Sequence, residues 1–403
     1  MLYGMKYLKE KLGSKTSRVR VRYQYYDMKH LALDFQISTP PKLRAWMNCL
    51  GWCSKAVDSL ADRLVFREFA DDNFNINEIF RMNNPDILVD SAILGALISS
   101  CDFIYISPDE SGYPRMQVVD GGNATGIIDP ITGMLKEGYA VLDRAEDGTP
   151  TIEAYFIPGE TQYYYAETSE LDIVGNDAPY PLLVPIINRP DAVRPFGRSS
   201  ISRACMSIVD SAMRTVKRSE ISAEFYSIPQ KYVLGTDPEV DAIEPWSAAM
   251  SAILEISKDE DGDKPTVGQF QQQTATPHIE QLKMFAGLFA GETGLTLDDL
   301  GFVSGNPASS EAIKAAHENL RLKAKAAQRS FGSGLLNAGY LAACLRDKTA
   351  YKRNQFYLTV PKWEPVFEPD SSALSGIGDA AIKLQQSFPD YFNEEKLRDL
   401  MGV

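Results

Sequence analysis

Apolar residues recur every three or four positions through much of the first 105 residues, which predicts a mainly helical N-terminal region. Residues 85–103 open with Pro85 and Asp86, a favourable helix start. Residues 41–66 predict one helix with a single apolar face, formed by Trp46, Leu50, Cys53, Val57, Leu60 and Leu64.

The pattern changes at residue 102 to short β-branched and aromatic runs separated by turn residues. The runs are DFIYIS, PRMQVVD, GYAVLDRA, TIEAYFIP and TQYYYAE. Short strands separated by turns rich in Gly, Pro, Asp and Ser predict an antiparallel meander. The stretch that follows, YPLLVPIINRP, holds three prolines and is interpreted as an extended connector.

Long helical patterns dominate the second half. Residues 198–226 predict a helix capped by Ser199 or Ser200, and Pro277 opens another that stops near Gly294. Between them, residues 227–276 predict a small α/β insert. The first of these helices has its apolar face at Ile201, Cys205, Ile208, Ala212, Val216 and Ala223.

A third long helix is expected from residue 310, with a kink at Gly332–Gly334. A strand at 355–367 and two short terminal helices complete an α+β chain. The apolar stripe of the third helix is Ile313, Ala316, Leu320, Ala324, Ala327 and Phe331.

Composition narrows the functional classes. The chain has 403 residues, 44% hydrophobic and 24% charged, with a net charge of −13. An acidic balance disfavours tight nucleic-acid binding, although a local basic stripe still permits weak contact. Five cysteines at irregular spacings predict a reducing compartment. No signal peptide is expected, and the apolar stretch 92–106 is too short to span a bilayer.

Motifs for catalysis or cofactor binding are weak. Gly376 and Gly378 stand in a G-x-G-x-x-A without a preceding strand, so a turn before a helix is the preferred interpretation. Cys49 and Cys53 lack a second ligand pair, and the acidic run 259–263 lacks the closing Glu of a calcium loop. We therefore predict no catalytic residues, no cofactor and no metal site.

The segment GFVSGNPASSEAIKAAHENLRLKAKAAQRSF (301–331) carries the clearest functional signal. A loop of Gly, Ser, Asn and Pro leads into a helix with Lys314, Arg321 and Lys325, spaced to lie on one helix face. Such a stripe is either an ordinary solvated face or a surface that contacts an anion. Its place after a flexible loop favours contact.

Three stretches together resemble the portal proteins of tailed bacteriophages, in particular those of siphophages that infect Gram-positive hosts. They are PFGRSSISRACMSIVDSAMRTVKRSE with SIPQKYVLG, the loop and helix from SGNPASSEAIK, and LTVPKWEPVFEP. The resemblance rests on their joint order and covers roughly half of the chain. It implies a portal-type subunit in a ring of about twelve identical copies.

The resemblance also implies a division of the chain. Residues 1–195 and 310–368 would form the wing, 196–226 and 277–297 the stem helices, and 227–276 the clip. Residues 298–309 would be the tunnel loop, and 369–403 a short crown. The implied DNA-channel residues are Phe302, Val303, Ser304, Gly305, Asn306 and Pro307, with Glu239, Asp241 and Trp246 on a clip docking surface.

The function implied is a channel at a capsid vertex for packaging and ejecting double-stranded DNA, assembled in the host cytoplasm. Implied partners are the terminase large subunit, a head-completion or neck protein, and the major capsid and scaffolding proteins, with no membrane. One alternative is another ring-forming virion protein of the neck or baseplate. A second is a cytosolic enzyme, but no set of residues suggests its active site.

Overall fold

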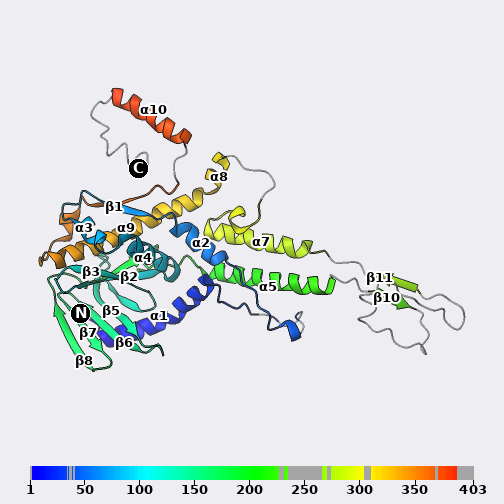
Figure 1. Cartoon of the computed structure of the whole chain (residues 1–403), viewed down its shortest axis with the longest axis horizontal. Coiled ribbons are helices and arrows are strands. Elements are labelled where there is room, and N and C mark those ends of the chain that lie inside the picture. Colours follow the sequence, from blue (N-terminus) through cyan, green and yellow to red (C-terminus); the bar gives the residue numbers. More distant parts are fainter. Residues whose placement is uncertain are drawn as a thin grey trace.

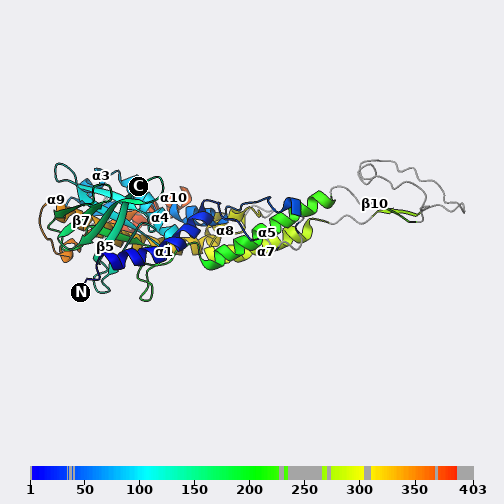
Figure 2. The same ribbon diagram turned by 90° about the horizontal axis from the view of Figure 1, so that it is seen from below.

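The computed structural model describes residues 2–33, 35, 39, 41–226, 231–234, 266–269, 274–303, 310–367 and 371–387. Within these residues the chain forms a body of helices and antiparallel sheets from which a pair of long helices projects (Figures 1 and 2). The short β10–β11 pair, Lys231–Leu234 and Thr266–Gln269, lies beyond the far end of that helix pair.

The predicted meander is divided between two antiparallel sheets: its last three runs are β5, β6 and β7 of a five-stranded sheet in the order β4-β5-β6-β7-β8, and its first two runs belong to another sheet. Turn residues separate the strands, as their spacing predicted. The strands of the five-stranded sheet are β4 (Ala124–Ile128), β5 (Leu135–Arg144), β6 (Pro150–Ile157), β7 (Glu160–Tyr165) and β8 (Glu170–Gly175).

A second, three-stranded sheet corrects the interpretation of the proline-rich connector. Strand β2 (Cys101–Pro108) lies between β3 (Pro114–Val119) and β9 (Leu183–Ile187). The expected connector is therefore a strand, with Pro185 opposite Phe103 in the register. Because β9 is an edge strand, one side of it pairs with no other strand of the sheet, so a proline without an N–H is tolerated there.

The first helix packs against the five-stranded sheet. Helix α1 (Met5–Tyr26) buries Leu8 and Leu12 against Tyr139 and Tyr155. The fully buried Glu137 accepts hydrogen bonds from the backbone N–H groups of Tyr3 and Gly4, at 2.8 and 3.0 Å. A carboxylate there satisfies unpaired donors and complements the positive end of the helix dipole.

Three further helices of the N-terminal region are α2 (Trp52–Ala61), α3 (Ile76–Arg81) and α4 (Pro85–Ser99). The predicted start of α4 at Pro85 is confirmed. The long helix predicted across residues 41–66 is wrong at its start, because α2 begins only at Trp52 and Trp46 is exposed. The short 3-10 turn η1 (Pro41–Leu43) precedes it.

Helix α9 (Glu318–Arg346) is the central helix of the body and buries Phe331, Leu335 and Leu341. The expected kink is not present as a break, since α9 runs unbroken through Gly332 and Gly334. Both glycines instead allow close packing: an added Cβ would lie 2.6 Å from Pro361 at Gly332 and 2.9 Å from Ile186 at Gly334.

The last described elements are the strand β12 (Val360–Trp363), the 3-10 turn η3 (Arg353–Phe356) and the helix α10 (Ser371–Ser387). β12 pairs with β1 (Phe66–Ala70), which closes the C-terminal segment onto the N-terminal region. Gly376 and Gly378 lie inside α10, so the turn expected there is wrong. The second predicted terminal helix lies outside the described residues.

Candidate functional site

Two helices form the projecting pair, α5 (Arg203–Tyr226) and α7 (Thr276–Thr293), and they lie side by side in both views (Figures 1 and 2). The start of α5 lies beside the end of α7, and the end of α5 lies beside the start of α7, so the pair is antiparallel. Three polar contacts join them: Ser202 Oγ to Glu292 Oε1 at 2.8 Å, Thr215 Oγ1 to Gln281 Oε1 at 3.0 Å, and Ser222 Oγ with His278 Nε2 at 3.3 Å.

One end of the helix pair is packed into the core of the body. Phe289 of α7 is fully buried there, with its ring centroid 5.6 Å from that of Trp52. Helix α5 is capped by Ser202, whose Oγ accepts the N–H of Cys205 at 3.1 Å, and not by Ser199 or Ser200 as predicted. Gly294, in the left-handed region at φ 82°, ends α7 at the predicted place.

The candidate DNA-channel segment begins directly after α7. Phe302 is half-buried and packs on the core, whereas the Val303 side chain is 80% exposed. Ser304, Gly305, Asn306 and Pro307 lie outside the described residues. The fold therefore places Val303, and not Phe302, as the apolar side chain open to solvent where this segment leaves the body.

A polar contact ties the two ends of this segment together. Asp299, in the 3-10 turn η2 (Asp298–Leu300), accepts hydrogen bonds from the backbone and hydroxyl of Thr296, and His317 Nε2 lies 3.2 Å from its Oδ2. Burial alone would raise the pKa of Asp299, but the Thr296 and His317 contacts lower it below its usual value. The carboxylate is therefore held ionised between the two segments.

The predicted basic stripe is divided by the fold. Lys314 is exposed on α8 (Ser310–Ala316), and the helix is interrupted at His317 before α9 starts. Arg321 pairs with Glu318 through Nη2 and Oε1 at 2.6 Å. Lys325 is exposed and, within the described part of the chain, has no hydrogen bond or ion pair. It is the member of the stripe best placed to meet an external anion.

The predicted clip residues Glu239, Asp241 and Trp246 lie outside the described residues, as does the acidic run 259–263. No group of three His, Cys, Asp or Glu side chains that could hold a metal occurs in the described ranges. Across those same ranges, no helix has both the length and the apolar character that crossing a bilayer requires.

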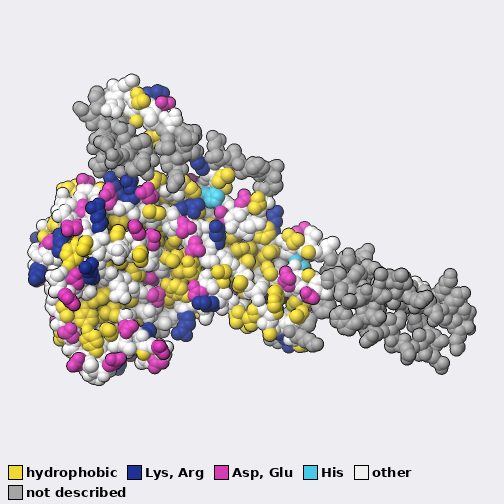
Figure 3. Space-filling view, in the orientation of Figure 1, with side chains coloured by type: hydrophobic (Ala, Val, Ile, Leu, Met, Phe, Trp, Pro, Cys, Tyr) yellow, Lys and Arg dark blue, Asp and Glu magenta, His cyan; other side chains and the backbone are white. Residues whose placement is uncertain are grey.

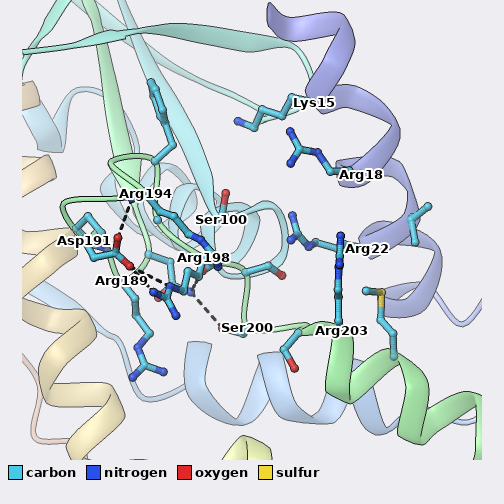
Figure 4. A pocket seen from close by; sticks show the side chains of 18 of the residues that line it. Lys15, Arg18, Arg22, Ser100, Arg189, Asp191, Arg194, Arg198, Ser200 and Arg203 are labelled. Atoms are coloured by element: carbon cyan, nitrogen blue, oxygen red, sulfur yellow. Dashed lines mark hydrogen bonds and ion pairs between the residues drawn. The ribbon is translucent and has the colours of Figure 1, made fainter.

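The sequence prediction missed a basic pocket where α1, α5 and the loop after β9 meet (Figure 4). Its volume is about 1330 Å³. Lys15, Arg18 and Arg22 reach from α1 toward Arg194 and Arg198 on the opposite wall. The cationic residues that line it are Lys11, Lys15, Arg18, Arg22, Arg189, Arg194, Arg198, Arg203 and Lys323.

Two carboxylates, Asp191 and Glu292, oppose these nine cations among the lining residues. Asp191 is already bound to Arg198. Burial and the nearby Lys15 lower the pKa of Lys11, while burial, Arg18 and Arg203 lower that of Arg22. Burial is the main cause of both shifts, and the neighbouring positive charges add to it.

One sequence signal could have located this pocket. The α1 cations at positions 11, 15, 18 and 22 are spaced by four, three and four, the spacing of one helix face. The cations at 189, 194, 198 and 203 follow some 170 residues later. Only the tertiary fold brings the two groups together.

With this geometry described, the fold can be compared with known structures. The chain aligns with a chain from the neck of an empty gene transfer agent particle, at a TM-score of 0.51 and 14% identity. The alignment covers 92% of this chain and 95% of that chain. The two therefore share a mixed α+β fold.

Sequence comparison finds similarity to two curated proteins. The chain is 25% identical to the portal protein of Mycobacterium phage D29 over 96% of its length and 83% of the relative's. It is 24% identical to that of Mycobacterium phage L5, covering 94% and 81%. No protein-family model matches it. Over most of its length the chain is therefore similar in sequence to two phage portal proteins.

Proposed function

We propose that this chain forms the portal ring of a tailed phage, through which double-stranded DNA is packaged and later ejected. The observation that carries the proposal is the similarity to two portal proteins over 94% and 96% of the chain. The two relatives come from mycobacteriophages. We assign the chain to the siphophage portals of Gram-positive hosts, as the sequence motifs suggested.

The exposed apolar side chains of the helix pair support assembly into a ring. Ile279, Met284 and Leu288 of α7 are each more than half exposed, and Figure 3 shows apolar side chains along this part of the molecule. A row of exposed apolar residues needs a partner, and in symmetric assemblies the partner is another copy. We infer that α5 and α7 are stem helices that face their counterparts in neighbouring copies.

The remaining regions take their roles from this arrangement. Residues 1–195 and 310–368 are the wing, 227–276 the clip, 298–309 the tunnel loop and 369–403 the crown. The clip, with Glu239, Asp241 and Trp246, is the proposed docking surface for the terminase motor and afterwards for a neck protein. The scaffolding and major capsid proteins would contact the ring from the capsid side.

A DNA conduit must let its cargo slide, and the charge of the chain suits that task. A net charge of −13 repels phosphate and keeps nonspecific affinity low. The exposed Lys325, close behind the tunnel loop, supplies a sparse positive contact. We propose that the loop from Val303 onward touches the DNA backbone and reads no bases.

The first experiment tests the ring itself. Native mass spectrometry of the purified chain, with negative-stain imaging, is expected to show closed rings of about twelve copies around a central hole wide enough for duplex DNA. Rings with a narrower hole would instead indicate a different neck or baseplate protein. A chain that stays monomeric at every concentration would contradict the proposal.

The second experiment tests the tunnel loop. Deletion of residues 303–306, or Lys325→Glu, is expected to leave ring assembly intact and to reduce DNA packaging or retention by about tenfold, because the loop contact with phosphate is lost. Lys348→Glu, beyond the opposite end of α9 and also exposed, is the matched control and should package normally. Normal packaging by the loop deletion would show that the assigned role is wrong.

A further inference from the structure

The basic pocket described above has cations that no residue within the described part of the chain neutralises. Lys15, Arg18, Arg189 and Arg203 have no hydrogen bond or ion pair through their side chains in the described ranges. Nine cations against two carboxylates give the lining a net +7, so the other residues of this −13 chain carry −20. Such a pocket attracts acidic groups, and a second copy of this acidic chain carries many carboxylates.

The lining argues for a protein segment and against DNA. Among the cations stand apolar side chains, including Val21, Phe196 and Met206. An interface pocket typically combines an apolar centre with polar groups around it. A surplus of seven positive charges on every copy would also bind DNA tightly and slow its passage, since each phosphate contact adds affinity.

The hairpin between β7 and β8 is the acidic segment of the chain that best fits this pocket. Glu167, Glu170 and Asp172 are exposed there, and no described residue forms an ion pair or hydrogen bond with their carboxylates. The other hairpin turns offer at most one unpaired acid each, such as Glu110 or Glu146, because their remaining acids are engaged. Asp109 binds Arg115, and Asp129 lies 3.6 Å from Lys136.

The same hairpin has the apolar surface that the pocket can accept. Leu171 and Ile173 of β8 are 50% and 52% exposed. β8 is the edge strand of its sheet, where an exposed apolar strand normally requires cover. Carboxylates alternate with apolar side chains along β8, so one element presents both of the chemistries found in the pocket lining.

We propose that the β7–β8 hairpin of one copy inserts into the basic pocket of the next copy, and that this contact joins neighbouring subunits. The inference rests on the proposed ring and names the surfaces that build it. Pocket and hairpin are different surfaces of one chain, so the contact is head-to-tail. Repetition of a head-to-tail contact produces a ring when the rotation closes.

The contact can be tested by exchanging charges between the two surfaces. The pocket variant carries Arg18→Glu and Arg203→Glu, and the hairpin variant carries Glu167→Lys and Glu170→Lys. All four residues are exposed in the single chain, so both variants should fold. The matched control, Lys6→Glu with Arg20→Glu, changes two exposed cations of α1 that do not line the pocket.

Each variant alone puts two charges of the wrong sign into every contact. We expect the concentration for half-maximal ring assembly, followed by native mass spectrometry, to rise at least about 100-fold, while the control assembles as the wild type does. An equal mixture is expected to assemble within about tenfold of wild type. In alternating rings, the two new carboxylates of the altered pocket meet the two new lysines of the altered hairpin, and the unchanged pocket meets the unchanged hairpin.

Other outcomes separate the possible errors. Wild-type assembly by the pocket variant alone overturns the contact, and if its rings also lose DNA, the pocket serves phosphate instead. Two folded variants that fail alone and also fail when mixed show that another segment occupies the pocket. A wild-type chain that forms no ring overturns the proposed function and this contact with it.

Discussion

Asp102 is a buried carboxyl group at the start of β2, and only 2% of the residue is exposed. Its Oδ1 accepts hydrogen bonds from Ser99 Oγ and from the Gly121 N–H, both at 2.9 Å. A Cβ at position 95 would lie 1.8 Å from its other oxygen, so Gly95 makes the space for it. Burial, assisted by the charge of Asp120, raises the pKa of Asp102 to about 7.

This raised pKa predicts a pH-dependent stability. The folded chain holds the Asp102 proton up to about pH 7, whereas the unfolded chain releases it near pH 4. The contribution is therefore fully present below about pH 4 and is lost as pH rises to about 7, at roughly 1.4 kcal/mol per pH unit. An Asn side chain at position 102 has no acidic proton, so the Asp102→Asn variant lacks this contribution at every pH.

Urea unfolding of wild type and Asp102→Asn at several pH values measures this effect. The free energy of unfolding of wild type should fall by about 2–3 kcal/mol relative to the variant between pH 5 and pH 7. All other titrating groups are shared by the two chains, so they cancel in the difference. Parallel profiles would mean that Asp102 stays ionised throughout this range.

Asp299 offers a second test at the residue scale. Asp299→Ala removes both the Thr296 cap and the His317 contact, so backbone amides at 296–303 should exchange with solvent about tenfold faster. His317→Ala leaves the Thr296 contacts in place and should give a smaller increase. Hydrogen-exchange mass spectrometry measures both, and equal exchange in Asp299→Ala and wild type would contradict the role of this carboxylate.

At the scale of elements, Phe289 determines how the α5–α7 pair is held to the body. Its ring is fully buried against Trp52, while the preceding residue, Leu288, is 55% exposed on the same helix. Phe289→Ala should lower the free energy of unfolding by about 3–5 kcal/mol, because it leaves a cavity. Leu288→Ala is the control, with an effect within about 0.5 kcal/mol in urea unfolding of the single chain.

Elements with a local signal were predictable from sequence. Pro85 starts α4 because its ring fixes φ, and Gly294 ends α7 because a residue without a Cβ adopts the left-handed conformation at little cost. β9 was missed because its prolines suggest a connector, and only its place at the sheet edge makes Pro185 acceptable. Similarly, the glycines of α9 suggested a kink, although their role is close contact with Pro361 and Ile186.

The candidate site likewise has features that the sequence predicts and features that only the tertiary fold shows. The loop at 301–309 and the cation at Lys325 are visible as local composition. The basic pocket is not, because its walls come from α1, from the loop after β9 and from α5. Pairing between Arg321 and Glu318 also depends on side-chain geometry, which a stripe of basic residues does not give.

At the scale of the whole molecule, the position of α10 indicates that this helix contributes to assembly and not to the folding of the body. α10 lies apart from the body in Figure 1, and no described residue of this helix belongs to the main hydrophobic core. Two of its apolar side chains, Ile382 and Leu384, are 60% and 44% exposed. A single helix of 17 residues is marginal in water without a partner, so its apolar face implies contact within the assembly.

A chain that ends at Phe367 should therefore unfold within about 2 °C of the full chain in calorimetry, because its core is unchanged. Its rings should dissociate at a protein concentration about tenfold higher than wild-type rings do, because the contacts of α10 are lost. A matched full-length variant, Ile382→Ser with Leu384→Ser, should reproduce the assembly defect alone. A large fall in the unfolding temperature of the truncated chain would instead make α10 part of the folding unit, since folding and assembly would then depend on the same contacts.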